Sequence, residues 1–284
     1  MKKKNLFTTL LIICTLLWSF SSCKNDENIT ASSASLTATA GDEAQASTIN
    51  DQLLSEVNTY IASVPQNVKS MSVIAATTTP SVILVSSSST LTDLSQKISI
   101  DFGTTGFTGR HGNILKGKII VDLKIRLLGL GIGTSRTITY DNFTINGISV
   151  TGSNIITFGG WTIAAQHPYW TISGENTITL ADGKTLTWKA ERKLEFTGGL
   201  TNFWGESYVL TGSASGVNAE GKAYSITINA NNPLIGSTLY PYITKGSVTI
   251  TIGQSTGVID YGDGTQDNKA TLTYSGVTYN FTIK

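Results

Sequence analysis

Residues 270–281, with the sequence ATLTYSGVTYNF, decide the fold class of this chain. Apolar and hydroxyl-bearing side chains alternate on both sides of Ser275-Gly276, which predicts two β-strands joined by a two-residue turn. The predicted cross-strand pairs are Tyr274–Val277, Leu272–Tyr279 and Ala270–Phe281 on one face, and Thr273–Thr278 and Thr271–Asn280 on the other. One face of this hairpin is therefore apolar, and the other is rich in hydroxyl groups.

Two turns earlier in the chain predict hairpins in the same way. Asn146-Gly147 is a strong turn signal, and residues 181–183 form a three-residue loop if Gly183 adopts the left-handed conformation. The predicted pairs are Ile145–Ile148 and Phe143–Val150 at the first turn, and Ile178–Leu186 and Thr179–Thr185 at the second. Because residues 97–284 keep a period of two, we expect an all-β domain there, an antiparallel β-meander of roughly a dozen strands forming a sandwich or a strongly curled sheet.

A short helix is predicted before the strands. After Asp51, apolar side chains recur at helical spacing until Pro65, at Leu53, Leu54, Val57, Tyr60 and Ile61. Residues 51–96 are thus expected to form this helix and an irregular segment that packs on the β domain. Residues 23–50 hold almost no large apolar side chain and are rich in Ser, Thr and Ala, which is typical of a flexible tether.

Residues 1–22 have the pattern of a lipoprotein signal peptide. Three lysines precede an apolar stretch from Leu6 to Phe20, which is too short to span a bilayer. Residues 19–23, SFSSC, resemble a bacterial lipobox, in which the cysteine is lipidated and becomes the mature N-terminus. We therefore predict lipidation at Cys23 and a membrane anchor that is effectively permanent.

Three segments together resemble one family of bacterial proteins. Cys23 is followed by KNDE, a tetrad similar to the signal that sends lipoproteins of Bacteroidota-type bacteria to the cell surface. Residues 134–147 and the motif IDYGDGTQDNKA at 259–270 are similar to segments of uncharacterised surface lipoproteins from these bacteria. The resemblance implies a protein that is lipid-anchored in the bacterial outer membrane and faces the cell exterior, and it implies no activity.

The charge balance argues against a nucleic-acid partner. Removal of the signal peptide takes away Lys2, Lys3 and Lys4 and leaves 17 of the 20 basic residues against 19 acidic ones, so no basic surface is expected. Cys14 leaves with the signal peptide, and Cys23 is then the one cysteine of the mature chain. A disulfide within one mature chain is therefore excluded.

Aromatic residues near the predicted strand ends are the candidate ligand-binding set. Flat aromatic rings outside the regular alternation suit the stacking of sugar rings, although Trp and Tyr are also ordinary, partly buried residues of sheets. The candidates are Trp161, Trp170, Trp204, Tyr169, Tyr240 and Tyr242.

Residues 260–268 are the candidate ion site. Four side chains offer the oxygen ligands that calcium prefers: Asp260, Asp263, Asp267 and Asn268. Their spacing does not match the EF-hand loop, and Asp-Gly followed by polar residues is also typical of a hairpin turn. We expect no other cofactor, because the two histidines, His111 and His167, are not flanked by metal-ligand motifs.

The leading functional hypothesis is a non-catalytic, surface-displayed β domain that binds a glycan or another extracellular partner. The alternative is a structural or amphiphile-handling envelope protein, whose curled sheet presents an apolar concave face to a lipid or a partner protein. A hydrolase is the third alternative, but no spacing selects two catalytic carboxylates among Glu191, Glu195 and Glu206.

Overall fold

The computed structural model describes residues 31–61, 72–75, 80–197 and 207–284, which form one long helix and one 16-stranded antiparallel sheet. The helix is α1 (Ser33–Ile61), and a short 3₁₀ turn, η1 (Gly129–Gly131), lies between two strands. The first eight strands are β1 (Ser72–Ala75), β2 (Ser81–Ser89), β3 (Asp93–Asp101), β4 (Phe107–Thr108), β5 (Ile114–Arg126), β6 (Ser135–Ile145), β7 (Ile148–Trp161) and β8 (Pro168–Thr179). The remaining strands are β9 (Thr185–Phe196), β10 (Ser207–Val217), β11 (Ala223–Ile228), β12 (Leu234–Ser237), β13 (Lys245–Ile252), β14 (Ser255–Asp263), β15 (Lys269–Tyr274) and β16 (Val277–Thr282).

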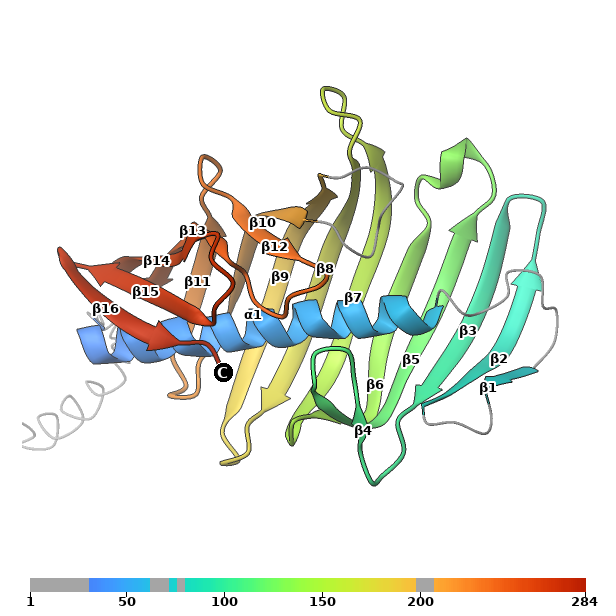
Figure 1. Ribbon diagram of the computed structural model, residues 1–284, viewed down its shortest axis with the longest axis horizontal. Helices are drawn as coiled ribbons and strands as arrows, with labels where there is room; N and C mark the ends of the chain where they lie inside the picture. The colour runs from blue at the N-terminus through green and yellow to red at the C-terminus, as the bar shows by residue number, and fades with distance from the viewer. Residues whose placement is uncertain (1–30, 62–71, 76–79, 198–206) are drawn as a thin grey trace, which may run out of the picture.

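Strands that are neighbours in sequence pair along almost the whole sheet. The order is β1-β2-β3-β5-β6-β7-β8-β9-β10-β11-β13-β14-β15-β16, with β4 paired to β5, and β12 paired to both β10 and β13. The sheet curves around α1, which lies along its concave face (Figure 1). The predicted all-β antiparallel meander is confirmed in its strongly curled form, as one sheet with more strands than the roughly one dozen expected.

The helix is longer than predicted. It starts at Ser33, and the hydroxyl oxygen of Ser32 accepts a hydrogen bond from the backbone N–H of Ser35 (3.2 Å), as an N-cap does. The tether prediction is therefore wrong for residues 33–50, which are helical and largely buried. Because residues around much of its circumference are buried, small Ala, Ser and Thr side chains replace the single apolar stripe of a surface helix.

The predicted signal peptide, the lipidation site Cys23 and the helix breaker Pro65 all lie outside the described residues. Within the described part of the chain, no helix is both long enough and apolar enough to cross a membrane.

The sheet begins earlier in the chain than predicted. β1 and β2 precede residue 97, and β3 starts at Asp93, within the segment that was expected to be irregular. The serine run 86–89 of β2 pairs with residues 94–97 of β3 although it is mostly exposed. Backbone hydrogen bonds to β3, rather than apolar burial, hold this run in the sheet, so the hydrophobic pattern does not reveal it.

The three predicted hairpins form at the predicted turns. All five pairs across Ser275-Gly276 are present, as are both pairs across residues 181–183. At Asn146-Gly147, Ile145 pairs with Ile148 and Thr144 with Ser149, in the predicted register, and the ladder is interrupted at Phe143, before the predicted pair with Val150. The register shifts between Thr139 and Thr144, where Asn142 has a positive φ of 48°, and this irregularity is a local feature that strand alternation cannot predict.

Two glycines inside long strands bring neighbouring backbones close together. Gly152 and Gly212 have φ values of 108° and 115°, which L side chains rarely adopt. A Cβ atom at either position would lie 2.2 Å from a carbonyl oxygen of the adjacent strand, that of Glu175 or Glu191. Glycine in a strand interior marks such close approaches and bends, which fits the strong curl of this sheet.

A buried ion pair joins α1 to the concave face. The Glu43 carboxylate accepts hydrogen bonds from Arg192 on β9 (3.2 Å) and from the Tyr224 hydroxyl on β11 (2.8 Å), and both members of the ion pair are almost fully buried. Arg192 also donates to the hydroxyl oxygen of Ser47 (2.7 Å). Burial raises the pKa of Glu43 more than Arg192 lowers it.

A set of amides fixes the helix about two turns after Glu43. The side-chain oxygen of Asn50 accepts hydrogen bonds from the amides of Asn154 on β7 (3.1 Å) and Asn176 on β8 (2.9 Å). These three residues are buried, so a shift of the helix along the sheet would break the hydrogen bonds between Asn50 and the two strand amides. Polar contacts of this kind set the register of α1 against the strands.

Candidate functional site

A cavity of about 380 Å³ lies between the C-terminal half of α1 and the concave face of the sheet. Its volume falls within the range of roughly 300–1,000 Å³ that is usual for small-molecule sites. Its apolar wall is formed by Leu54 and Ile61 of the helix and by Ile156, Trp170, Ile172, Leu194 and Phe196 of β7, β8 and β9. The cavity is therefore suited to an apolar group of a ligand.

The strand pattern explains why these side chains meet. Trp170 and Ile172 are two residues apart on β8, and alternate residues of a strand point to the same face. Leu194 of β9 is the cross-strand partner of Trp170, and the Phe196 ring lies 5.4 Å from the Trp170 ring in an edge-to-face arrangement. The aromatic part of the wall is thus held by both strand pairing and ring contacts.

One cationic side chain lines this apolar space. Arg136 lies on β6, and its Nη1 atom donates a hydrogen bond to the side-chain oxygen of Asn58 on the helix. Burial lowers the pKa of Arg136 to about 10, which still leaves the guanidinium charged at neutral pH. Among the described residues, no carboxylate forms an ion pair with it.

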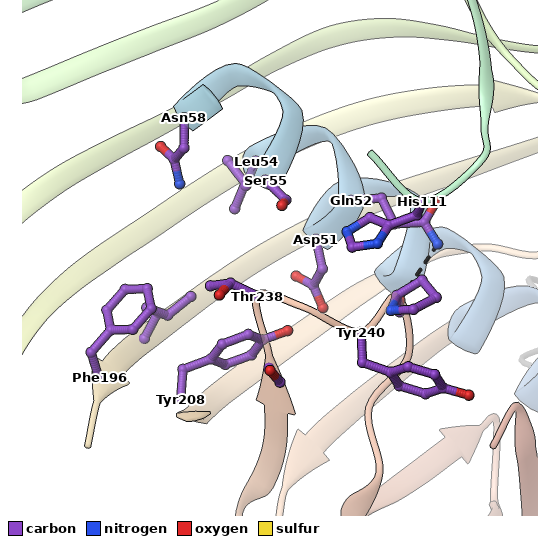
Figure 2. A pocket seen from close by; sticks show the side chains of 13 residues that line it. Asp51, Gln52, Leu54, Ser55, Asn58, His111, Phe196, Tyr208, Thr238 and Tyr240 are labelled. Carbon is purple, nitrogen blue, oxygen red and sulfur yellow. Dashed lines mark hydrogen bonds between the residues drawn. The ribbon is translucent and has the colours of Figure 1, made fainter. Parts of the chain in front are cut away.

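A second, smaller space of about 40 Å³ adjoins the cavity, and several polar side chains border it; it is called the polar space below. Figure 2 shows the carboxyl group of Asp51 pointing from α1 toward Thr238 and Tyr208. Within the described part of the chain, Asp51 Oδ2, Ser55 Oγ and Thr238 Oγ1 are buried and have no hydrogen-bond partner. The space is large enough for water, and polar groups of this kind are usually solvated or bound to a ligand.

The electrostatics of the polar space are set by burial. Burial raises the pKa of Asp51 to about 6, because the opposing effect of Arg192 is smaller. Burial, together with the nearby Asp51 charge, raises the pKa of the Tyr208 hydroxyl well above its usual value, so Tyr208 stays neutral. The two neighbouring spaces therefore carry different ionisable groups. The Arg136 guanidinium lines the apolar cavity, and the Asp51 carboxyl lines the smaller space.

The candidate aromatic residues do not all lie on one surface. Trp170 faces the cavity, and Phe158 links it to Trp161, with ring centroids 5.1 Å and 4.9 Å away, respectively. Tyr169, the residue before Trp170, points to the opposite face, where Lys193 Nζ lies 4.7 Å from its ring. The predicted glycan platform is thus divided between the two faces of the sheet.

The remaining aromatic candidates lie elsewhere. Tyr240 and Tyr242 follow β12, with ring centroids 5.8 Å apart, and Tyr240 lines the small polar space. Trp204 lies outside the described residues. A role for these side chains in binding stays a prediction.

The candidate calcium loop is built from turn hydrogen bonds. Asp260 accepts from the backbone N–H of Gly262 (2.7 Å), and Asp267 accepts from that of Lys269 (3.0 Å). Asp263 Oδ1 accepts hydrogen bonds from the backbone N–H and the hydroxyl group of Thr265, and the Asn268 amide donates to the Ile283 carbonyl (3.1 Å). In the ranges that the structure describes, no group of three or more His, Cys, Asp or Glu residues is arranged to hold a metal ion.

The structure brings together residues that the sequence did not single out. Arg136, Asn58 and Asp51 carry no recognisable motif, and they converge because a helix crosses the strands. The one signal available was Arg136 itself, a charged residue at an inward position of an alternating strand. His167, which no metal-ligand motif flanks in the sequence, lies with its Nδ1 atom 3.1 Å from Glu195 Oε1.

Comparison of the chain with protein-family models, with curated proteins and with solved structures finds no match. The resemblance to surface lipoproteins of Bacteroidota-type bacteria therefore remains a prediction from the sequence.

Proposed function

We propose that this chain is a lipid-anchored lipoprotein of the bacterial outer membrane, facing the cell exterior, whose non-catalytic β domain binds a small amphiphilic molecule. The cavity between α1 and strands β6 to β9 carries this proposal, because its size and apolar wall suit a hydrocarbon group. The lipobox-like segment ending at Cys23 supports the anchor.

The amphiphile-handling function is preferred to glycan binding on one observation. Trp170, the candidate ring best placed to meet a ligand, belongs to a mainly apolar cavity and not to an exposed platform. Sugar recognition needs polar groups beside the ring, whereas the neighbours of Trp170 in the cavity wall are chiefly Ile172, Leu194 and Phe196.

The experiment compares the small molecules that co-purify with three forms of the full-length protein. Leu194→Trp fills the cavity from its wall, and Thr171→Trp adds the same ring to the exposed face of β8 as a matched control. Extracts of each protein, made under conditions that leave the covalent anchor in place, are compared by mass spectrometry, and thermal unfolding verifies that each variant is folded.

An amphiphile present in wild type and Thr171→Trp but depleted in Leu194→Trp is the expected result. Equal contents in all three folded proteins would overturn the cavity as the binding site. Since Leu194 is only partly buried, its replacement is expected to keep the fold.

A further inference from the structure

We infer that the cavity selects amphiphiles with a small anionic headgroup, such as a carboxylate, and that Arg136 binds this headgroup. The inference rests on the proposed function and names its class of ligand. It follows from a comparison of the two arginines that face the helix.

Arg136 and Arg192 occupy the same row of cross-strand partners on the concave face. Arg136 pairs with Ile156, Ile156 with Ile172, and Ile172 with Arg192, so the two arginines flank a pair of isoleucines. The row places one arginine at each side of the apolar strip that lies beneath α1.

The two arginines contact different kinds of helix residue. Arg192 forms the buried ion pair with Glu43 at 3.2 Å. Arg136 donates instead to the neutral amide of Asn58, fifteen residues further along the same helix. A buried charge is normally paired with an opposite charge, and the position where a carboxylate would pair with Arg136 holds an amide instead.

The neighbouring space suits a ligand that supplies the missing charge. The guanidinium lines the cavity and lies near the last turn of α1, whose dipole helps to tolerate a cation but does not neutralise it. A carboxylate fits the planar donor groups of arginine, and the hydrocarbon chain behind it meets the wall formed by Ile172 and Trp170.

The Asp51 carboxyl determines the orientation of such a ligand. Asp51 lies seven residues before Asn58, about 10 Å along the helix, so the negative and positive groups are at separate places beside the cavity. An anionic headgroup is repelled from Asp51 and attracted to Arg136.

The test measures the binding of decanoate and decanol to full-length protein in nanodiscs by calorimetry, with empty nanodiscs subtracted. Wild type is expected to bind decanoate at least about tenfold more tightly than decanol, a difference of about 1.4 kcal/mol. Asn58→Asp supplies an internal counter-ion to Arg136, and Arg136→Gln removes the cation. Both variants are expected to lose the preference for decanoate while they still bind decanol.

The possible outcomes separate the two proposals. The headgroup assignment would be overturned if wild type bound decanol as tightly as decanoate, or if folded Asn58→Asp kept the wild-type preference for decanoate over decanol. Either result would leave the cavity proposal standing. Binding of neither ligand would overturn both. Because Asn58→Asp creates an ion pair rather than removing one, loss of folding is not its expected effect, and thermal unfolding verifies this.

Discussion

At the scale of single residues, a buried ion pair holds the helix against the concave face of the sheet. Glu43 and Arg192 are both almost fully buried, and each is stable inside the protein only because the other is present. Arg136 lies in the same row of cross-strand partners and has no carboxylate partner among the described residues. The contrast between these two arginines separates a structural ion pair from a candidate binding group.

Removal of one member of the ion pair is predicted to be costly. Arg192→Met leaves Glu43 as a buried charge without its partner, and we expect the free energy of unfolding to fall by about 3–5 kcal/mol. The double variant Glu43→Gln/Arg192→Met removes both charges and is expected to lose less than the sum of the two single variants. Urea denaturation of all four proteins measures this, and strictly additive losses would contradict it.

Ionisation of Asp51 is predicted to lower the free energy of unfolding as the pH rises from about 4 to about 6, and this loss persists at higher pH. Its pKa rises from 3.8 to about 6 on folding, so between these values the folded state keeps a proton that the unfolded state has lost. The contribution of Asp51 to the free energy of unfolding therefore decreases as the pH rises through this window, by at most about 3 kcal/mol.

Asp51→Asn removes this titration. The variant is expected to gain stability relative to wild type as the pH rises from 4 to 6, and to keep that advantage at higher pH. Thermal unfolding across this range compares the two proteins. A stability difference that does not change with pH would show that the Asp51 carboxyl is not shifted.

At the scale of elements, α1 is a core element although its composition resembles that of a linker. Residues 33–50 carry Ser, Thr, Asn and acidic side chains, and many of these bond the strands around them. A sequence pattern that looks for one apolar stripe misses such a helix, because it is buried on more than one face. Strand periodicity, in contrast, is local, so it predicted the hairpins at Ser275-Gly276 and Gly183 with the correct register.

Two glycine substitutions are predicted to act in opposite directions. Gly41 lies inside α1 with nothing within 4 Å of an added Cβ atom, so Gly41→Ala is expected to raise stability by about 0.5–1 kcal/mol. Gly212 has a φ of 115°, and a Cβ atom there would lie 2.2 Å from the Glu191 carbonyl oxygen, so Gly212→Ala is expected to lower stability by at least about 1–3 kcal/mol. Chemical denaturation of both variants measures the two shifts, and shifts of the same sign would contradict this account.

At the scale of the whole molecule, one curled sheet replaces the two packed sheets of a sandwich. The helix occupies the concave face in place of a second sheet, and Figure 1 shows it lying across the strands. Beside the C-terminal half of α1 the sheet leaves the cavity lined by Trp170 and Ile172. The candidate site is thus a consequence of covering a wide sheet with a single helix.

The sequence predicted the fold class but not the site. Alternation in strands such as β8 and β15 is a local signal, whereas Arg136, Asn58 and Asp51 come together only when the distant helix lies across the sheet. Of the aromatic residues proposed from sequence, Trp170 reaches the cavity because its strand position faces the helix, and Tyr169 does not because it is one residue out of phase.

The most direct test of the central claim is photo-crosslinking of full-length protein in its own membranes with dodecanoic acid that carries a diazirine in mid-chain. Peptide mapping is predicted to place adducts on the cavity wall, in the segments that contain Trp170, Leu194 and Leu54, and excess decanoate is predicted to suppress them. Adducts found only on the exposed face of the sheet, or adducts that excess decanoate does not reduce, would contradict the account.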